Sequence, residues 1–162
     1  MKDNNDSYEP NDINVTIETS TLAASTYKTI KGCGVIPGVV EGEALVCPKS
    51  VTGWKGVDPL MGIMQENGHV NRGKSIKDKI LIIPGSKGSN GWSCFFSATK
   101  PAKTSPKAIL ATSIDSSAGV AIAFMQIPAI VDFPKDEDPC KLFRNGDRLR
   151  IDGGSGVVEL IK

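Results

Sequence analysis

A loop rich in glycine and serine, residues 84–93, holds the side chains of this sequence that are best suited to chemistry. Its three glycines would let a ligand approach the backbone closely, and backbone amides ahead of a helix favour a carboxylate or a phosphate. Lys87, Ser89 and Asn90 add polar groups to the same loop. The loop therefore predicts a site for an anionic ligand, although a plain strand-to-helix connection could contain the same glycines. The order of a nucleotide-binding P-loop is absent.

A second loop, residues 113–117, has Asp115 followed by two serines at the expected start of a helix. These residue types are typical of helix N-caps, so capping is the first expectation and chemistry the second. His69 is the single histidine of the chain and falls in a long loop. A hydrolytic triad therefore has little support, and His69 is expected to be structural or idle unless other features give it a role.

The elements that must position these loops are three short apolar runs, each typical of a strand buried on both faces. Helical segments are expected between them, as in the β-α-β-α-β pattern of a parallel sheet. In such a sheet, ligands bind outside the carboxyl ends of the strands. The runs are residues 79–83, 107–111 and 128–132, and the helical segments are residues 92–100 and 118–126.

The two ends of the folded region have a different pattern. Residues 148–152 alternate polar and apolar side chains, a Gly-Gly-Ser-Gly turn follows, and residues 157–161 read as a second strand, which predicts a β-hairpin. Residues 35–46 read as strands interrupted by proline and glycine. The fold class predicted is α/β, a three-layer domain with a parallel central sheet and a second, antiparallel sheet.

The chain is expected to contain one folded domain, residues 31–162, behind a polar tail, residues 1–30. The tail has five acidic and two basic residues and many Asn, Ser and Thr, which predicts mobility. Residues 52–75 contain five glycines and one proline without a clear period, so they are expected to form a long loop. A loop of this length in a small domain is usually functional.

Charge and composition exclude several classes of protein. The net charge of the 162 residues is +1 and the basic residues form no stripe, so neither nucleic acid nor an anionic membrane is expected as a partner. No apolar run is long enough to span a bilayer and no signal peptide is evident, so a cytoplasmic protein is expected. The four cysteines are widely spaced and form no Cys-x-x-Cys pair, which argues against a metal site on this chain.

Several motifs in order resemble the small, swivelling domain of the aconitase X family. The resemblance runs from about residue 31 to residue 162 and therefore covers the whole predicted domain. The motifs that carry it are Gly53-Trp54-Lys55-Gly56-Val57-Asp58-Pro59, Gly62-Ile63, Gly68-His69, Gly73-Lys74-Ser75-Ile76, Lys79-Ile80-Leu81-Ile82-Ile83-Pro84, Gly88-Ser89, Pro106-Lys107-Ala108-Ile109 and Ile127-Pro128-Ala129-Ile130-Val131.

The resemblance implies a swivelling β/β/α fold and a role as the small subunit of a hydro-lyase. It implies a large partner subunit that holds iron or an iron–sulfur cluster, with no cofactor bound by this chain alone. Members of the family dehydrate small hydroxylated carboxylic acids. The first expectation is a substrate like cis-3-hydroxy-L-proline, and the alternative is 5-phosphomevalonate.

The resemblance also implies roles for individual residues. Ser89 matches the serine of the family's Gly-Ser pair, which acts as the proton acceptor. Since a serine is a weak base, it would need a helix N-terminus and Lys87 nearby to stabilise its alkoxide. Substrate binding is expected at Lys87, Gly88, Asn90, Asp58 and His69, and no residue is expected to bind metal.

The chain departs from the pattern of phosphomevalonate dehydratases directly after Ser89. Those enzymes tend to continue with small residues, whereas Trp92 occupies such a position here, which predicts a different substrate pocket. Cys94 lies in the same segment, and its approach to the partner's metal is not expected. Two further alternatives stay open: a phosphohistidine carrier, which would need a histidine where Ser116 and Ser117 stand, and a binding module without catalysis.

Overall fold

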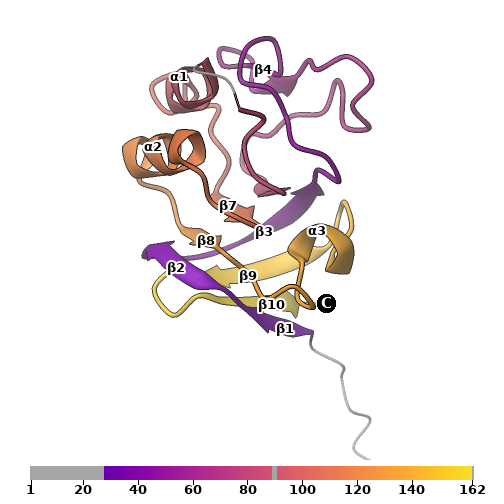
Figure 1. Cartoon of the computed structure of the whole chain (residues 1–162), viewed down its shortest axis with the longest axis vertical. Coiled ribbons are helices and arrows are strands. Elements are labelled where there is room, and N and C mark those ends of the chain that lie inside the picture. Colours follow the sequence, from indigo (N-terminus) through magenta and orange to yellow (C-terminus); the bar gives the residue numbers. More distant parts are fainter. Residues whose placement is uncertain (1–27, 89–90, 162) are drawn as a thin grey trace, which may run out of the picture.

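The structure is a computed structural model, and it describes residues 28–88 and 91–161 (Figure 1). Strands dominate the described part, and two of its helices lie side by side at one end. The strands are β1 (Thr29–Lys31), β2 (Cys33–Ile36), β3 (Val39–Val46), β4 (Val57–Asp58), β5 (Ile63–Met64), β6 (Ile80–Ile83), β7 (Ala108–Ala111), β8 (Ala129–Val131), β9 (Arg148–Asp152) and β10 (Val157–Ile161). The helices are α1 (Gly91–Ala98), α2 (Ser116–Met125) and α3 (Pro139–Leu142).

Strand β3 belongs to two differently built halves of one sheet, whose order is β1-β10-β9-β3-β6-β7-β8-β2. Its first part, from Val39 to Glu43, pairs antiparallel with β9. Its last part, from Ala44 to Val46, pairs parallel with β6. Strands β6, β7 and β8 continue the parallel half, and β1, β10 and β9 form the antiparallel half.

The two edge strands of this sheet are neighbours in the sequence. β1 pairs with β10 at one edge, β2 pairs with β8 at the other, and only Gly32 separates them. The edges must therefore meet, so the sheet folds back on itself. Figure 1 shows β1 and β2 as one continuous strip that crosses in front of β9 and β10.

Side chains of the parallel strands enter two separate cores on the two faces of the sheet, because successive residues of a strand point in opposite directions. Leu81, Ile109 and Val131 pack with the helical residues Trp92 and Ile122. Ile80, Leu110 and Ile130 pack instead with residues of the antiparallel half, which contributes Leu149, Ile151 and Val158. The layers are thus helices, parallel strands and antiparallel strands.

Local signals in the sequence explain where the helices begin and end. Asp115 caps α2 by accepting hydrogen bonds from the amides of Ser117 and Ala118, and Gln126 ends the helix in a left-handed conformation. Asp138 caps α3, whose first residue is Pro139, a favoured position for proline.

The predicted fold class, a three-layer α/β domain with a parallel and an antiparallel sheet, is confirmed. The long loop of residues 52–75 contains only the two-residue strands β4 and β5, and the short helix α3 was not predicted. β1 begins at Thr29, two residues before the predicted domain boundary at residue 31. Mobility was predicted for residues 1–30, of which residues 1–27 lie outside the described residues, so it stays a prediction.

No helix within residues 28–88 and 91–161 has the length and apolar character needed to cross a membrane.

Glycines allow the β1–β2 strip to cross the β9–β10 hairpin at van der Waals distance. The Gly32 amide donates to the Gly156 carbonyl, and the Gly153 amide donates to the Gly38 carbonyl, both at 2.9 Å. A Cβ atom on Gly153 would lie 2.1 Å from the carbonyl oxygen of Ile36, and one on Gly34 would lie 2.3 Å from that of Gly153. Any side chain here would push the two segments apart.

We predict that Gly153→Ala lowers the free energy of unfolding by about 3 kcal/mol or more, because its methyl group would overlap a backbone carbonyl that cannot move independently. Urea titration of the purified chain measures this. The control is Gly119→Ala in α2, where the new Cβ would lie 3.6 Å from Ile114 and the change removes a flexible residue from a helix. If Gly153→Ala and Gly119→Ala were equally stable, the close approach of Gly153 to the Ile36 carbonyl would be contradicted.

Candidate functional site

The two loops that the sequence marks as candidate sites are joined by one carboxylate. Ser86, three residues after β6, donates from its amide to Asp115 Oδ2 at 2.9 Å and from its hydroxyl to Asp115 Oδ1 at 2.8 Å. The same carboxylate caps α2 through Ser117 and Ala118. The expectation of capping at Asp115 is confirmed, and the structure adds that Asp115 also fixes the start of the glycine-rich loop.

The environment of Asp115 favours its charged form. Partial burial opposes ionisation, but the hydrogen bonds from Ala118, Ser86 and Ser117 outweigh it and lower the pKa of Asp115 below its ordinary value. The carboxylate is therefore charged at neutral pH and holds both loops through charge-assisted hydrogen bonds, which are stronger than neutral ones.

A second carboxylate, Glu66, ties the glycine-rich loop to the long loop. Lys87 Nζ lies 2.8 Å from Glu66 Oε1, and the Thr52 amide donates to Glu66 Oε2 at 2.7 Å. The Glu66 side chain is only 14% exposed. Burial opposes its ionisation, but the hydrogen bonds from Lys87 and Thr52 outweigh that effect and lower the pKa of Glu66. Lys87 is thus held in one direction, and among residues 28–88 and 91–161 its ammonium, which has three N–H donors, pairs with Glu66 alone.

His69 borders a cavity of about 190 Å³ that Lys49, Glu66 and Lys87 also line. The Asn71 amide donates to His69 Nδ1 at 3.1 Å, and His69 Nε2 lies 3.3 Å from the Lys49 carbonyl. With Nδ1 as acceptor, the geometry fits the tautomer in which Nε2 donates to the Lys49 carbonyl. The structure therefore brings His69 and Lys87 to one cavity, with both ring nitrogens already engaged in holding the loop.

His69 does not occupy the place that a phosphohistidine carrier would need. That place, at the start of α2, is taken by the N-cap Asp115 and the first helical residues Ser116 and Ser117, and the chain has no other histidine.

Asp58 lies in the β4–β5 hairpin of the long loop. Its Oδ1 accepts from the amides of Leu60 and Met61 at 2.9 and 3.1 Å, and its Oδ2 accepts from Gln65 Nε2 at 3.2 Å. This pattern is an Asx turn, which shapes the hairpin. Asp58 is not in the cavity with Lys87 and His69, and its substrate-binding role stays a prediction.

Ser89 and Asn90 lie outside the described residues, so their predicted roles stay predictions. Gly88, directly before them, is exposed and has a φ of +26°, with no atom within 4 Å of where a Cβ would be. Gly91, directly after them, begins α1. The segment is thus bounded by Lys87 on one side and by a helix N-terminus on the other.

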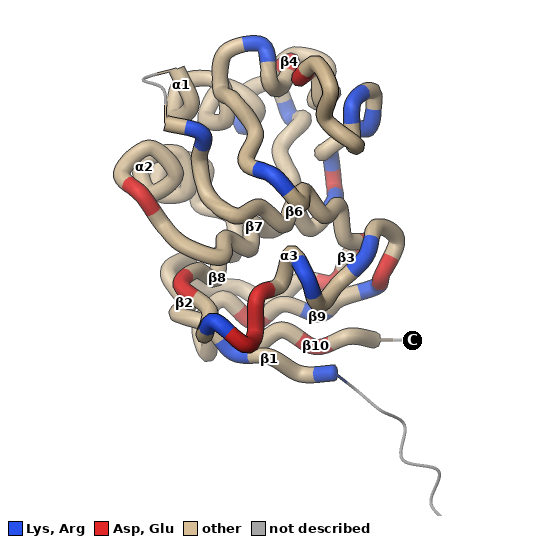
Figure 2. The backbone as a smooth tube through the Cα atoms, turned by 45° about the vertical axis from the view of Figure 1, so that its right-hand side comes forward, with Lys and Arg blue, Asp and Glu red and all other residues tan. Residues whose placement is uncertain are grey.

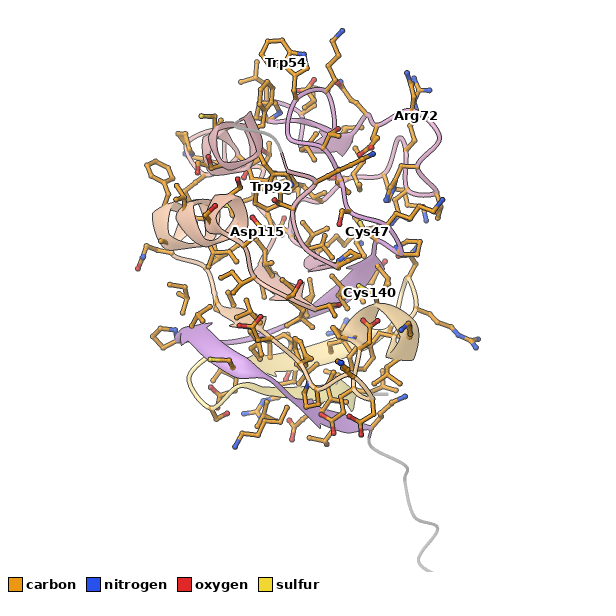
Figure 3. The ribbon with its side chains drawn as sticks, in the orientation of Figure 1. Cys47, Trp54, Arg72, Trp92, Asp115 and Cys140 are labelled. Atoms are coloured by element: carbon orange, nitrogen blue, oxygen red, sulfur yellow. The ribbon has the colours of Figure 1, made fainter. Side chains whose placement is uncertain are left out.

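Trp92, whose bulk was the basis for predicting a different substrate pocket, lies in the core. Its side chain is fully buried, stacks on Phe96 with ring centroids 4.0 Å apart, and donates from Nε1 to the Val51 carbonyl at 2.9 Å. Figure 3 shows Trp92 in the interior, beneath α1. A helix turns successive side chains to different faces, and this one faces the core, so Trp92 gives no reason to exclude any substrate.

Apolar side chains lie exposed beside the segment that contains Ser89. Trp54 is 65% exposed and packs edge-on against Phe95 of α1, with centroids 5.5 Å apart. Figure 3 shows Trp54 at the outer end of the molecule. We call this surface the apolar rim; it consists of Trp54, Pro59, Leu60, Met61, Cys94, Phe95 and Ala98, and it includes a cavity of about 250 Å³.

The described part of the chain contains no group of three or more His, Cys, Asp or Glu side chains that could hold a metal ion. Burial raises the pKa of the Cys47 thiol to about 12 and that of the Cys140 thiol to about 11. Both thiols therefore stay protonated at neutral pH, a form that binds metal poorly. Cys94 is exposed on α1, in the apolar rim.

A model of the aconitase X swivel domain matches residues 29–160, from the first residue of β1 almost to the end of β10. The chain belongs to the aconitase X swivel-domain family.

Relatives and solved structures agree with this membership. A phosphomevalonate dehydratase small subunit from Methanococcoides burtonii is 38% identical over 128 residues, covering 76% of this chain and 89% of the relative. One from Pyrococcus furiosus is 35% identical over 132 residues, covering 82% and 95%. The crystal structure of Thermococcus kodakaraensis aconitase X in its holo form has a TM-score of 0.77 and 30% identity, covering 83% of this chain and 99% of that chain.

Two features of this swivel domain were not predicted from the sequence, namely the pairing of Glu66 with Lys87 and the link from Asp115 to Ser86. One feature of the sequence could have drawn attention to Glu66: it is the only acidic residue between Asp58 and Asp78. Its partner could not be read from the sequence, since the two residues of each pair come from different loops.

We predict that Asp115→Ala lowers the free energy of unfolding by about 1–3 kcal/mol at pH 7, because it removes both a helix cap and the anchor of Ser86. Since the folded-state pKa of Asp115 is lowered, its contribution is complete above the ordinary value of 3.8 and is lost as the pH falls below it. The difference between wild type and variant should therefore shrink below about pH 4.

Chemical denaturation from pH 3 to pH 7 measures this effect. Asp136→Ala is the matched control, because Asp136 is exposed and its carboxylate contacts no polar group among the residues that the structure describes. A difference for Asp115→Ala that does not vary with pH would show that its charge contributes nothing.

Proposed function

We propose that this chain is the small subunit of a hydro-lyase and that the complete enzyme dehydrates 5-phosphomevalonate or a closely similar phosphorylated hydroxy acid. The observation that carries the proposal is the likeness of the whole swivel domain to phosphomevalonate dehydratase small subunits from several archaea. These relatives favour the alternative substrate over the first expectation, cis-3-hydroxy-L-proline. The buried position of Trp92 removes the objection that the sequence raised against it.

Dehydration breaks a C–H bond beside the substrate carboxylate and a C–O bond at the next carbon, forms a C=C bond and releases water. We assign acceptance of the proton to Ser89, the residue that the family resemblance marks. Lys87, fixed by Glu66, has N–H donors left for a substrate oxygen or for the Ser89 oxygen. A cation beside a serine stabilises its alkoxide and so lowers the barrier to proton transfer.

We assign the iron or iron–sulfur site, which the resemblance implies, to the large subunit. The described residues of this chain contain no group of three or more side chains that could hold a metal ion. The roles that we assign to this chain are proton transfer and substrate orientation.

The apolar rim supports the assignment of a large partner subunit. Trp54, Leu60 and Met61 are each at least 65% exposed, which is unfavourable for aromatic and aliphatic side chains of a protein that works alone. The rim adjoins α1, whose first residue directly follows the segment of Ser89 and Asn90. A partner bound to the rim would thus contact α1, the helix that directly follows these two residues in the sequence.

The test of the function uses the chain assembled anaerobically with its large subunit. We predict that the complex converts 5-phosphomevalonate to a product lighter by one water, and that Ser89→Ala reduces kcat by about 10²- to 10⁴-fold, the usual contribution of a general base. Mass spectrometry of the product and initial rates measure this.

Ser93→Ala is the control, because Ser93 is a serine four positions further along the chain, within α1. This variant should retain activity. Dehydration of cis-3-hydroxy-L-proline instead of 5-phosphomevalonate would restore the first substrate expectation. Full activity of Ser89→Ala would remove Ser89 from the mechanism.

We predict that Trp54→Asp weakens association with the large subunit by at least about tenfold, because an exposed tryptophan at the centre of an interface contributes much of the binding energy. Val120→Asp on α2 is the matched control, since Val120 is 60% exposed and lies outside the apolar rim. Analytical ultracentrifugation of the mixed subunits measures the dissociation constants. Equal weakening by both variants would argue against the rim as the contact.

A further inference from the structure

A further cavity, lined by Glu66 of the Lys87–Glu66 pair, has no role in the proposals so far. Its volume is about 550 Å³, enough for a small phosphorylated acid. The cavity lies between the turn that follows Thr52 and the outer part of the long loop. Its polar lining consists of Thr52, Lys55, Gln65, Glu66, Asn67 and Arg72.

The charge of this cavity is positive. The side chains of Lys55 and Arg72 have no ion pair or hydrogen bond to any residue in 28–88 or 91–161. Glu66 is the only acidic residue of the lining, and its two oxygens are already bound by Lys87 and Thr52. Figure 2 shows that basic residues recur on the loops around β4, at the end of the molecule opposite β1.

The backbone that carries Lys55 is fixed rather than loose. Lys55 has a φ of +58°, a left-handed conformation that is unfavourable for a residue with a side chain. The turn closes through a hydrogen bond from the Gly56 amide to the Gly53 carbonyl, and a Cβ on Gly53 would lie 2.2 Å from Trp92 Cα. The turn therefore rests directly on α1, and the cation is presented from a supported position.

The cavity adjoins the smaller one that His69 and Lys87 line, because the two cavities share lining residues. Glu66 and Asn67 line both this cavity and the smaller one that contains His69 and Lys87. One extended ligand could therefore place a polar group at Lys87 and a second anionic group between Lys55 and Arg72. A phosphorylated hydroxy acid has such a pair of anionic groups, whereas hydroxyproline has only one carboxylate.

We propose that Lys55 and Arg72 form a binding site for the phosphate group of the substrate. This inference rests on the proposed function, because it takes the substrate to be a phosphorylated hydroxy acid. Arginine and lysine are the side chains best suited to a phosphate dianion, the first through paired N–H donors and the second as a compact charge. Thr52 and Asn67 line the same cavity and can add neutral hydrogen bonds.

The experiment compares Lys55→Gln, Arg72→Gln and the double variant in the anaerobic complex with the large subunit. We expect KM for 5-phosphomevalonate to rise about tenfold in each single variant and further in the double variant, with kcat within about threefold of wild type, because a uniform binding interaction is lost. Inorganic phosphate should inhibit the wild-type complex competitively and the double variant at least about tenfold more weakly.

The matched controls are Lys103→Gln, an exposed lysine with a φ of +59°, and Arg144→Gln, an exposed arginine, both outside the cavity. Their KM should stay at the wild-type value. An unchanged KM in the double variant would overturn the site. So would failure of the double variant to assemble, since Lys55 and Arg72 would then contact the large subunit.

A second arm separates this inference from the proposed function. If the wild-type complex does not dehydrate 5-phosphomevalonate, the proposed function fails, and calorimetric titration with inorganic phosphate decides the site alone. Phosphate binding by the wild-type complex that is lost in the double variant would support it. Equal binding by both complexes, or none by either, would overturn it.

Discussion

The fold depends on one constraint: its two edge strands are consecutive in the chain. Because a single residue, Gly32, joins β1 to β2, the edges of the sheet must meet, and β3 has to serve the antiparallel and the parallel halves in turn. The close crossing of β1–β2 over the β9–β10 turn is possible only where side chains are absent. The parallel strands are then enclosed by helices on one face and by the antiparallel half on the other, and their carboxyl ends point toward the loops.

Two carboxylates organise those loops, and each joins segments that are distant in the sequence. Asp115 holds Ser86 to the start of α2, and Glu66 holds Lys87 to Thr52. Ser86 and Lys87, the two residues directly before Gly88, are therefore constrained before any ligand binds. Pre-organisation of this kind reduces the entropy lost on binding, which suits the loop to which we assign the proton acceptor.

The sequence predicted the elements whose signals are local. The apolar run of β6 and the alternating pattern of β9 identified strands, and Asp115 identified the start of α2. α3 has only four residues, too few for a helical period, and β1 continues the polar composition of the tail. The burial of Trp92 could not be predicted from the sequence, because the face of a helix that packs on the core depends on elements far along the chain. The pairing of Glu66 with Lys87 is tertiary for the same reason.

The two tryptophans of this chain occupy opposite environments, and this difference makes each a separate spectroscopic reporter. Trp92 is sealed against Phe96, so its fluorescence senses whether the helical layer is folded. Trp54 is in water in the isolated chain, and its emission shifts to shorter wavelength when a surface covers it. Folding and subunit assembly can therefore be followed in one sample, without labels, by the emission of two side chains thirty-eight positions apart.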